Sequence, residues 1–549
     1  MQWLKQLLAR RPSLPAPALV NGFPAPWDLD RPGIHGHLAD FALEPGGRLP
    51  EAALTLPDEA LIASRSGSAM RWAPGALDGV FGHHTSQSDA ISSEQALHAL
   101  ASASTTRSPE HVKDFYDLVN DDRVLSLVDP LLEAVQQSDS LDADAVRLFA
   151  RWLMCEAPDR SPVKIGIALL GLIQPQQDTV ALMRLGLHDE FTLYVAVALS
   201  NSLPTDEAEE ALWTLARSVD GWGRIHLVER LSRTGRADLK AWLLREGYKN
   251  SIMVEYLAHP CANGGDLLEA LQADTVDDAL LHGAGEILQA LIAGGPVADI
   301  GAYDDGVEAV ERFLFHVAGR ASPPLTIYLA VSAIAGFVDG VDKADEARED
   351  LAAQGWLPER RAAIGAKAAE ILAAPRWREL TTASLAAEDG ETFWTAASVA
   401  EHLGLDIWDT RLERQRLGKG PQWFWLMRST DPDRIDRALA LALAQIDLAA
   451  IATGPGEELG LGPAFAQHSA LDSVLQELGH SPGKGAAFIA AGLRSPVTRN
   501  RNMAVRALQG WGRPAWPPEA LAQLTQAHSD EPDAGLRERM AALLGDEAA

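Results

Sequence analysis

From about Ser92 onward, apolar and polar residues follow the period of an amphipathic helix. The predicted helices are about ten to twenty residues long, and short turns rich in Gly, Pro, Asp or Ser separate them. Turns as short as these join antiparallel neighbours, because the chain can only reverse onto the helix that it has just completed. The pattern therefore predicts an all-α protein built from stacked helix pairs.

The segment SPVTRNRNMAVRALQGWG, residues 495–512, shows the form most clearly. Ser495 can cap the helix, Pro496 suits its first turn and Gly510 suits its end. At about 100° per residue, one set of side chains lies within about 40° of a single line and a polar set lies opposite. The first set is Val497, Ala504, Leu508 and Trp511, and the second is Arg499, Asn502 and Arg506. We expect the first face to be buried.

Similar helices begin near Ser161, His188 and Val219. When they are aligned on one position of each helix, the steps are about 30, 32 and 60 residues. The aligned positions are Ala168, Ala198, Arg230 and Ala290. The longest step leaves room for an intervening unit near Glu255. A period of about 30 to 34 residues indicates a helical solenoid, because each pair must bury its apolar stripe against a neighbouring pair.

The Pro-Val-x-Arg-x-x-x-Met-Ala-Val-Arg-Ala-Leu pattern that begins at Pro496 resembles the second helix of a HEAT repeat. The segments GWGRIHLVERL, LLREGYKNSIMVEYLAHPCANGGDLLEAL and LGLGPAFAQHSALDSVLQELG are similar to stretches of bacterial HEAT-like proteins of unsettled role. The resemblance covers roughly residues 80 to 545, and it implies a HEAT-like α-solenoid of stacked antiparallel helix pairs.

Some relatives of this kind carry the label limonene hydroxylase. Hydroxylation of a terpene needs haem, flavin or non-haem iron. The sequence has no GxGxxG after a predicted strand and no cysteine in a setting that suggests a haem ligand. We therefore carry over the fold but not this activity, and we predict no cofactor.

Residues 1–85 differ from the rest of the chain because prolines punctuate them throughout. These are Pro12, Pro15, Pro17, Pro24, Pro26, Pro32, Pro45, Pro50, Pro57 and Pro74. Proline breaks the interior of a helix, so no long helix is expected here. The sequence predicts an irregular or partly β N-terminal capping segment over 1–85, followed by the solenoid over 86–549.

The charge balance is 47 basic against 76 acidic residues, a net charge of −29. A field of this sign repels phosphate, so we predict no binding to nucleic acid or to an anionic membrane surface. It attracts a basic partner instead. The 15 tryptophans suit large packed layers or a binding groove.

The two cysteines, Cys155 and Cys261, are far apart and belong to no CxxC motif, which excludes a disulfide framework and fits a reducing compartment. The first residues, MQWLKQLLARR, lack the uninterrupted apolar core of a signal peptide. The longest uncharged stretch, 321–338, opens near two prolines and reads as a buried core helix rather than a membrane span. We predict a cytoplasmic location.

The first candidate site lies on two predicted helices, 222–231 and 250–259. Its residues are Trp222, Arg224, His226, Glu229 and Arg230 on the first, with Glu255, Tyr256 and His259 on the second. Adjacent antiparallel helices could bring a carboxylate and an imidazole together for acid–base chemistry. Salt bridges and hydrogen-bonded core histidines explain the same residues without any catalytic role.

The second candidate is the basic helix at 494–513, where Arg499 and Arg501 could bind an anion or carboxylate. Alternatively, Asn500 and Arg501 lie on the flanks of the apolar face, where polar side chains can hydrogen-bond to adjacent repeats. The third candidate is the run QWFWLM, where Trp423 and Trp425 could anchor a partner or pack in the core.

Histidine pairs raise the question of a metal site. His35 and His37 would share one face of a strand, and His83 adjoins His84. No suitably spaced carboxylate or cysteine completes a ligand set, so we predict no metal. Likewise, no Walker, GxSxG, HExxH or EF-hand motif occurs.

The leading hypothesis is therefore a non-enzymatic interaction module or scaffold, an acidic α-solenoid that binds a protein or peptide partner. The alternative is an enzyme or small-molecule-binding protein with a site around Trp222, His226, Glu229 and Glu255.

Overall fold

The computed structural model describes residues 22–66, 73–78, 92–120, 124–173, 176–341 and 351–545. Within these ranges every regular element is a helix, and the only strand-like pairing is a single bridge between Glu458 and Val497. The all-α prediction is confirmed. The chain divides into two compact units, unit 1 at 1–374 and unit 2 at 375–549, which we describe separately.

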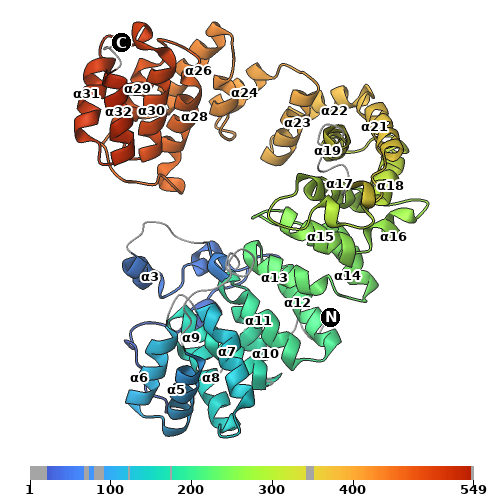
Figure 1. Cartoon of the computed structure of the whole chain (residues 1–549), viewed down its shortest axis with the longest axis vertical. Helices are drawn as coiled ribbons and strands as arrows, with labels where there is room; N and C mark the ends of the chain where they lie inside the picture. The colour runs from blue at the N-terminus through green and yellow to red at the C-terminus, as the bar shows by residue number, and fades with distance from the viewer. Residues whose placement is uncertain are drawn as a thin grey trace. The chain divides into compact units, whose positions relative to one another are not determined.

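Unit 1 begins with short helices and continues as consecutive helix pairs (Figure 1). Its elements are α2 (Ile34–Asp40), η1 (Glu51–Leu54), α3 (Glu59–Ser66), α5 (Ser93–Thr106), α6 (Pro109–Val119), α7 (Val124–Gln137), α8 (Ala143–Glu156), α9 (Arg160–Ile173), η2 (Gln176–Asp178), α10 (Thr179–Leu185), α11 (Asp189–Ser202), α12 (Thr205–Ala216), α13 (Gly221–Leu231), α14 (Ala237–Trp242), the π-helical turn η3 (Leu243–Gly247), α15 (Glu255–Gly264), α16 (Leu267–Gln272), α17 (Asp278–Ala293), η4 (Ile300–Ala302), α18 (Gly306–Ala318), α19 (Leu325–Val341) and α21 (Pro358–Leu372).

Unit 2 has the same construction, with α28 to α32 lying side by side (Figure 1). Its elements are α22 (Arg376–Ser384), α23 (Gly390–His402), α24 (Trp408–Arg416), α25 (Trp423–Met427), α26 (Pro432–Gln445), α27 (Leu448–Ile451), η5 (Pro463–Phe465), α28 (Ala466–Leu478), α29 (Ala486–Leu493), α30 (Thr498–Trp511), η6 (Arg513–Ala515), α31 (Ala520–Asp530) and α32 (Ala534–Gly545).

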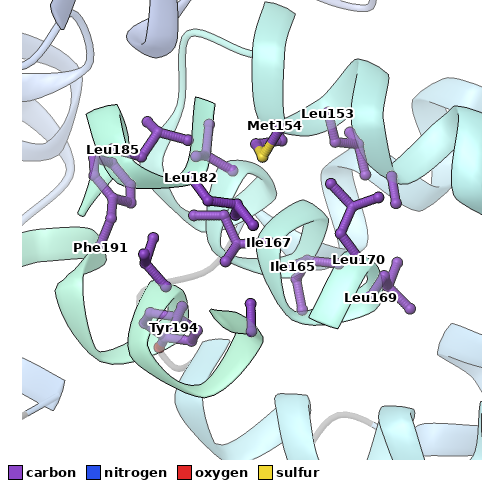
Figure 2. Close-up of a cluster of buried hydrophobic side chains, with 14 of the residues drawn as sticks. Leu153, Met154, Ile165, Ile167, Leu169, Leu170, Leu182, Leu185, Phe191 and Tyr194 are labelled. Carbon is purple, nitrogen blue, oxygen red and sulfur yellow. The ribbon is translucent and has the colours of Figure 1, made fainter. Parts of the chain in front are cut away.

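Neighbouring helices share one continuous core in the first part of unit 1. Leucine, isoleucine and aromatic side chains from α8, α9, α10 and α11 interdigitate (Figure 2). Two glycines on α9 allow the close approach of its neighbours. A Cβ on Gly166 would lie 2.7 Å from the Ala150 carbonyl oxygen, and a Cβ on Gly171 would lie 2.8 Å from the Ala198 Cα. The helices therefore pack backbone to backbone at these points.

The helix predicted at 495–512 is α30, and its buried and exposed faces are those that the periodicity predicts. Ala504, Leu508 and Trp511 are buried, whereas Arg506 is exposed. The predicted cap differs from the structure. The helix begins at Thr498 after Val497, and the Ser495 hydroxyl accepts a hydrogen bond from the Val497 amide at 3.1 Å instead of capping the helix.

Polar contacts between successive helix pairs in unit 2 join residues about one predicted step apart. The Trp511 indole donates to the Leu478 carbonyl, 33 residues away, and Arg501 pairs with Glu531, 30 residues away. In unit 1 the Gly223 amide and the Asp189 carboxylate are 34 residues apart, whereas His282 and Thr326 are 44 apart. The step therefore lengthens in the later part of unit 1.

The described part of the N-terminal segment, 22–66 and 73–78, packs on the helices of unit 1 and contains no strand. Arg184 of α10 donates to the carbonyls of Leu38 and Phe41. The Arg160 guanidinium at the start of α9 binds Asp58 through two nitrogens, each at 3.0 Å. The predicted boundary at residue 85 and the pair His83 and His84 lie outside the described residues.

The uncharged stretch at 321–338 corresponds to most of α19, where Ile327, Val331 and Ile334 are buried. None of the helices in the described ranges has both the length and the apolar character that a membrane crossing requires.

Candidate functional site

The first predicted site gathers only part of its residues. Trp222 on α13 contacts Tyr256 on α15, with ring centroids 5.2 Å apart. One turn further along α13, His226 Nδ1 lies 4.0 Å from the Glu229 carboxylate. Trp222, His226 and Glu229 thus lie along one side of α13, because their spacing of four and three residues follows the helical repeat.

Two arginines of the same helix donate hydrogen bonds to backbone carbonyls instead. Arg224 projects from the other side of α13, where it donates to the carbonyls of Ala216 and Glu246 at 2.5 and 2.6 Å. Arg230 donates to the His226 carbonyl at 2.8 Å. Glu255 is half-buried at the first position of α15. The structure therefore brings together an aromatic pair and a carboxylate–imidazole pair, but it turns Arg224 away from them.

The basic helix α30 is joined to neighbouring helices by buried polar contacts. Arg501 and Glu531 are both fully buried, and two hydrogen bonds of 2.7 Å join them. The remaining Arg501 nitrogen donates to the carbonyls of Ser495 and Pro496 at 2.8 and 3.1 Å. Because this guanidinium has no contact with solvent, we place Arg501 outside any partner surface.

The neighbours of Arg501 belong to the same kind of network. The Asn500 amide, also buried, donates to the His468 carbonyl at 2.9 Å and to the Asp472 carboxylate. Arg499 is partly exposed and pairs with Asp472. The Asp472 carboxylate therefore joins α28 to α30 through two side chains, an arrangement that the alternative interpretation of this helix predicts.

The histidine pair at the N-terminus lies on a helix rather than a strand. His35 and His37 are on α2, and residues two apart on a helix point about 200° away from each other. Burial, together with the nearby cations of Arg184 and Arg151, lowers the pKa of His35 to about 4. The geometry that a shared metal would require is absent at this pair.

An aromatic patch lies in unit 2, formed by Trp394 of α23 with Phe424 and Trp425 of α25. The Trp425 ring centroid is 4.7 Å from that of Trp394 and 5.3 Å from that of Phe424. All three rings are half-buried, whereas the predicted anchor Trp423 is only 3% exposed and packs in the core. Of the predicted tryptophans, Trp425 is thus the one that solvent reaches.

A buried arginine lies against two rings of the aromatic patch. The Arg411 guanidinium of α24 lies 4.8 Å from the Trp425 ring centroid and 5.7 Å from that of Trp394. It donates to Gln422 Oε1 at 3.0 Å and to Glu401 Oε1 at 2.8 Å. A guanidinium within about 6 Å of a ring centroid is attracted to the face of that ring, so the cation favours this arrangement of both rings.

The same two helices, α23 and α24, border a surface hollow of about 460 Å³. Its apolar wall includes Phe393 and Leu417, and its polar wall includes Arg414 and Lys419. The Arg414 guanidinium lies 4.1 Å from the Phe393 ring centroid and donates to the Ala387 carbonyl at 2.9 Å. A hollow of this size can accept a side chain of a partner.

Sequence reasoning found Trp425 but missed Trp394 and Arg411, which are distant in the chain. Trp394 precedes Trp425 by 31 residues, close to the predicted repeat step. Pairing aromatic residues one step apart would therefore have identified it.

Comparisons with known proteins add little to this geometry. No protein-family model and no curated protein matches the chain. Among solved structures, a crystal structure of an engineered protein from the Northeast Structural Genomics Consortium is 16% identical, covering 82% of this chain and 98% of its own. Its TM-score is 0.21, so we infer nothing about the fold or function of this chain from the likeness.

Proposed function

We propose that this chain is a protein-interaction module, a HEAT-like α-solenoid that holds a protein or peptide partner. The observation that carries the proposal is the aromatic patch of Trp394, Phe424 and Trp425. Tryptophan and arginine dominate the energetics of interfaces, above all where the rings are preorganised. Here the Arg411 cation favours the arrangement of two of the rings before any partner arrives, so binding orders them at less cost.

The fold proposal is supported by the contacts between repeats. Helices pack with the preceding and following pair, and their polar contacts recur at about the predicted step. In a solenoid each pair contacts only its neighbours and the array presents an extended surface. An extended surface suits a peptide or a partner helix better than it suits a small molecule.

Charge favours a basic partner. Unit 1 has 30 basic and 53 acidic residues, a net charge of −23, whereas unit 2 has 17 and 23, a net charge of −6. Such a field raises the rate at which a basic partner arrives, and salt screens it. The aromatic patch then supplies the apolar contacts that salt does not weaken.

The test compares two half-buried tryptophans of unit 2, Trp425 in the patch and Trp516 beside Arg513. Immobilised wild-type and variant proteins would be incubated with lysate at low and high salt, and stoichiometric partners identified by mass spectrometry. We expect Trp425→Ala to lose the partner and Trp516→Ala to retain it. For the purified partner, the loss should be about 2 kcal/mol or more by calorimetry.

Equal recovery on both variants would contradict the role of the patch. Recovery of no stoichiometric protein by the wild type at either salt concentration would contradict the interaction function itself.

A further inference from the structure

Four polar side chains meet on the later helices of unit 1, apart from the candidate sites described above. His282 and Glu286 lie on α17, Thr326 is the second residue of α19, and Tyr248 follows η3. His282 Nδ1 is 2.9 Å from Thr326 Oγ1, and His282 Nε2 is 3.2 Å from Glu286 Oε2. The Tyr248 hydroxyl donates to the same carboxylate oxygen.

The contacts of a neutral His282 determine its tautomer. A carboxylate can only accept, so Nε2 must hold the imidazole proton that faces Glu286. The other nitrogen, Nδ1, is then an acceptor, and the Thr326 hydroxyl must donate to it. The hydroxyl proton therefore already points at a base, which is the arrangement that activates an alcohol as a nucleophile.

Glu286 is held in place from two sides. Burial would raise the pKa of this carboxyl group, but the hydrogen bonds from His282 and Tyr248 outweigh burial and lower the pKa below its ordinary value. The carboxylate therefore stays ionised and orients the imidazole, as the third member of a nucleophile–base–acid set does.

The cluster is accessible, unlike the polar networks of the core. The His282 side chain is 31% exposed and that of Glu286 is 35% exposed, and Thr326 is half-buried. Thr326 also lies in the first turn of α19, a helix of 17 residues. The Ile327 amide donates to the Pro324 carbonyl at 3.1 Å, and the helix dipole favours negative charge at this end of α19.

We propose that Thr326, His282 and Glu286 form an acyl-transfer site that hydrolyses small uncharged esters. Thr326 Oγ1 attacks the ester carbonyl carbon while its proton passes to His282 Nδ1. The oxyanion develops beside the first turn of α19. The C–O bond to the leaving group then breaks, and the proton on His282 passes to the departing alcohol, which leaves an acyl-threonine.

Hydrolysis of the acyl-threonine completes the cycle. His282 takes a proton from water, the hydroxide attacks the acyl carbon, and the proton returns to Thr326 as the acid departs. The net reaction consumes one ester and one water and needs no other reactant. Glu286 and Tyr248 act as positioning residues, because neither touches the reacting atoms. The site goes beyond the proposed partner binding, and its residues belong to unit 1.

The test uses p-nitrophenyl acetate and the full-length protein. We expect the wild type to release p-nitrophenol with saturation, and Thr326→Val to lower kcat/KM about 100-fold or more, in line with loss of an activated nucleophile. Thr326→Ser should restore most of the rate. Glu286→Gln should lower kcat and leave KM nearly unchanged, as expected for a positioning residue.

Free imidazoles also cleave this ester, so exposed His480 of unit 2 provides the matched control. His480→Ala should leave the saturable rate unchanged, and intact-mass analysis of a rapidly quenched reaction should find one acetyl group on Thr326. Circular dichroism checks that each variant is folded. A wild-type rate no higher than that of Thr326→Val, or acetylation elsewhere only, would overturn the proposal.

Discussion

Both units bury charged side chains. In unit 1 these side chains join the N-terminal segment to the helices, whereas in unit 2 they join successive helix pairs. In unit 1, Lys164 is fully enclosed between Glu190 of the adjacent helix, at 2.6 Å, and Asp78 of the N-terminal segment, at 2.7 Å. In unit 2, Arg501 and Glu531 join one helix pair to the next. The contact between Lys164 and Asp78 closes a loop of 86 residues, whereas Arg501 and Glu531 are 30 residues apart.

This difference predicts which contacts each unit loses when its buried charged cluster is broken. A contact between adjacent repeats is reinforced by the apolar stripe beside it, because the same helices already pack together. A contact to a distant segment must instead offset the loop-closure entropy of everything between. We therefore expect a broken cluster to release the N-terminal segment in unit 1 and to loosen one repeat interface in unit 2.

The largest effect is expected for Lys164→Ala. It leaves the carboxylates of Asp78 and Glu190 buried without their shared cation, which costs on the order of 3–5 kcal/mol. Urea denaturation followed by tryptophan fluorescence measures the loss. Hydrogen exchange should show faster exchange in 73–78 and 22–66 before the helix pairs of unit 1 change. Lys113→Ala removes an exposed pair with Asp117 and serves as the control.

If Lys164→Ala destabilised the protein no more than Lys113→Ala, the cluster would not hold the segment.

Lowering the pH is a second test of the same contact. Lys164 and Arg160 lower the pKa of Glu190 to about 2 although burial opposes them. The stabilisation is present above the ordinary pKa of a glutamate, about 4.3, and it is lost as pH falls toward 2.

The next effect is expected in unit 2. Glu531→Gln keeps the shape of the side chain but leaves the Arg501 cation buried without an opposite charge, which costs about 3 kcal/mol. Exchange should accelerate in α30 and α32 and stay unchanged in α9 and α11. Equal acceleration of exchange in both units would show that the effect of the substitution is not local. It would contradict the expectation that each helix pair depends only on its neighbours.

A third prediction concerns Asp189, which accepts a hydrogen bond from the Gly223 amide at 3.0 Å. Burial raises the pKa of Asp189 to about 8, helped by the nearby carboxylates of Asp220 and Glu190. A raised pKa means that the native state binds the proton more tightly than the unfolded state. Stability contributed by this group is therefore full below pH about 4 and is lost as pH rises toward 8.

Asp189→Asn removes this titration and keeps the acceptor for Gly223. We expect it to stabilise the protein at pH 8 by about 1–3 kcal/mol, allowing for partial solvent contact, and to change little at pH 4. Asp220→Asn is the matched control. Its carboxylate accepts from the amides of Gly221 and Ser251, and despite burial these bonds lower its pKa, so the control should destabilise at pH 8.

The sequence predicted correctly those features that depend only on the helical spacing of apolar residues. The faces of α30 followed from the apolar spacing, because burial depends only on which residues recur every three or four positions. The repeat step likewise anticipated the separation of Arg501 and Glu531, although not that the two would pair. Local pattern therefore predicted that the chain forms helices and that neighbouring helices pack together.

What sequence could not supply was convergence between distant segments. Asp78 and Lys164 are 86 residues apart and lie outside any repeat relationship, so nothing in their local sequence marks them as partners. Trp394, by contrast, is 31 residues from Trp425, so the repeat step could have identified it as a partner. Thr326 was missed because 44 residues, rather than about 30, separate it from His282. An irregular separation therefore concealed the contact between His282 and Thr326.

The smallest effect is expected where an ion pair spans adjacent repeats of unit 2 on the surface. Arg437 and Asp409 are 2.7 Å apart and both are more than half exposed. Arg437→Ala should cost less than about 1 kcal/mol, because solvent screens the pair and the side chains lose freedom to form it. Its separation of 28 residues resembles that of Arg501 and Glu531. A urea midpoint close to the wild type, beside a large shift for Glu531→Gln, would show that burial rather than repeat spacing gives these pairs their strength.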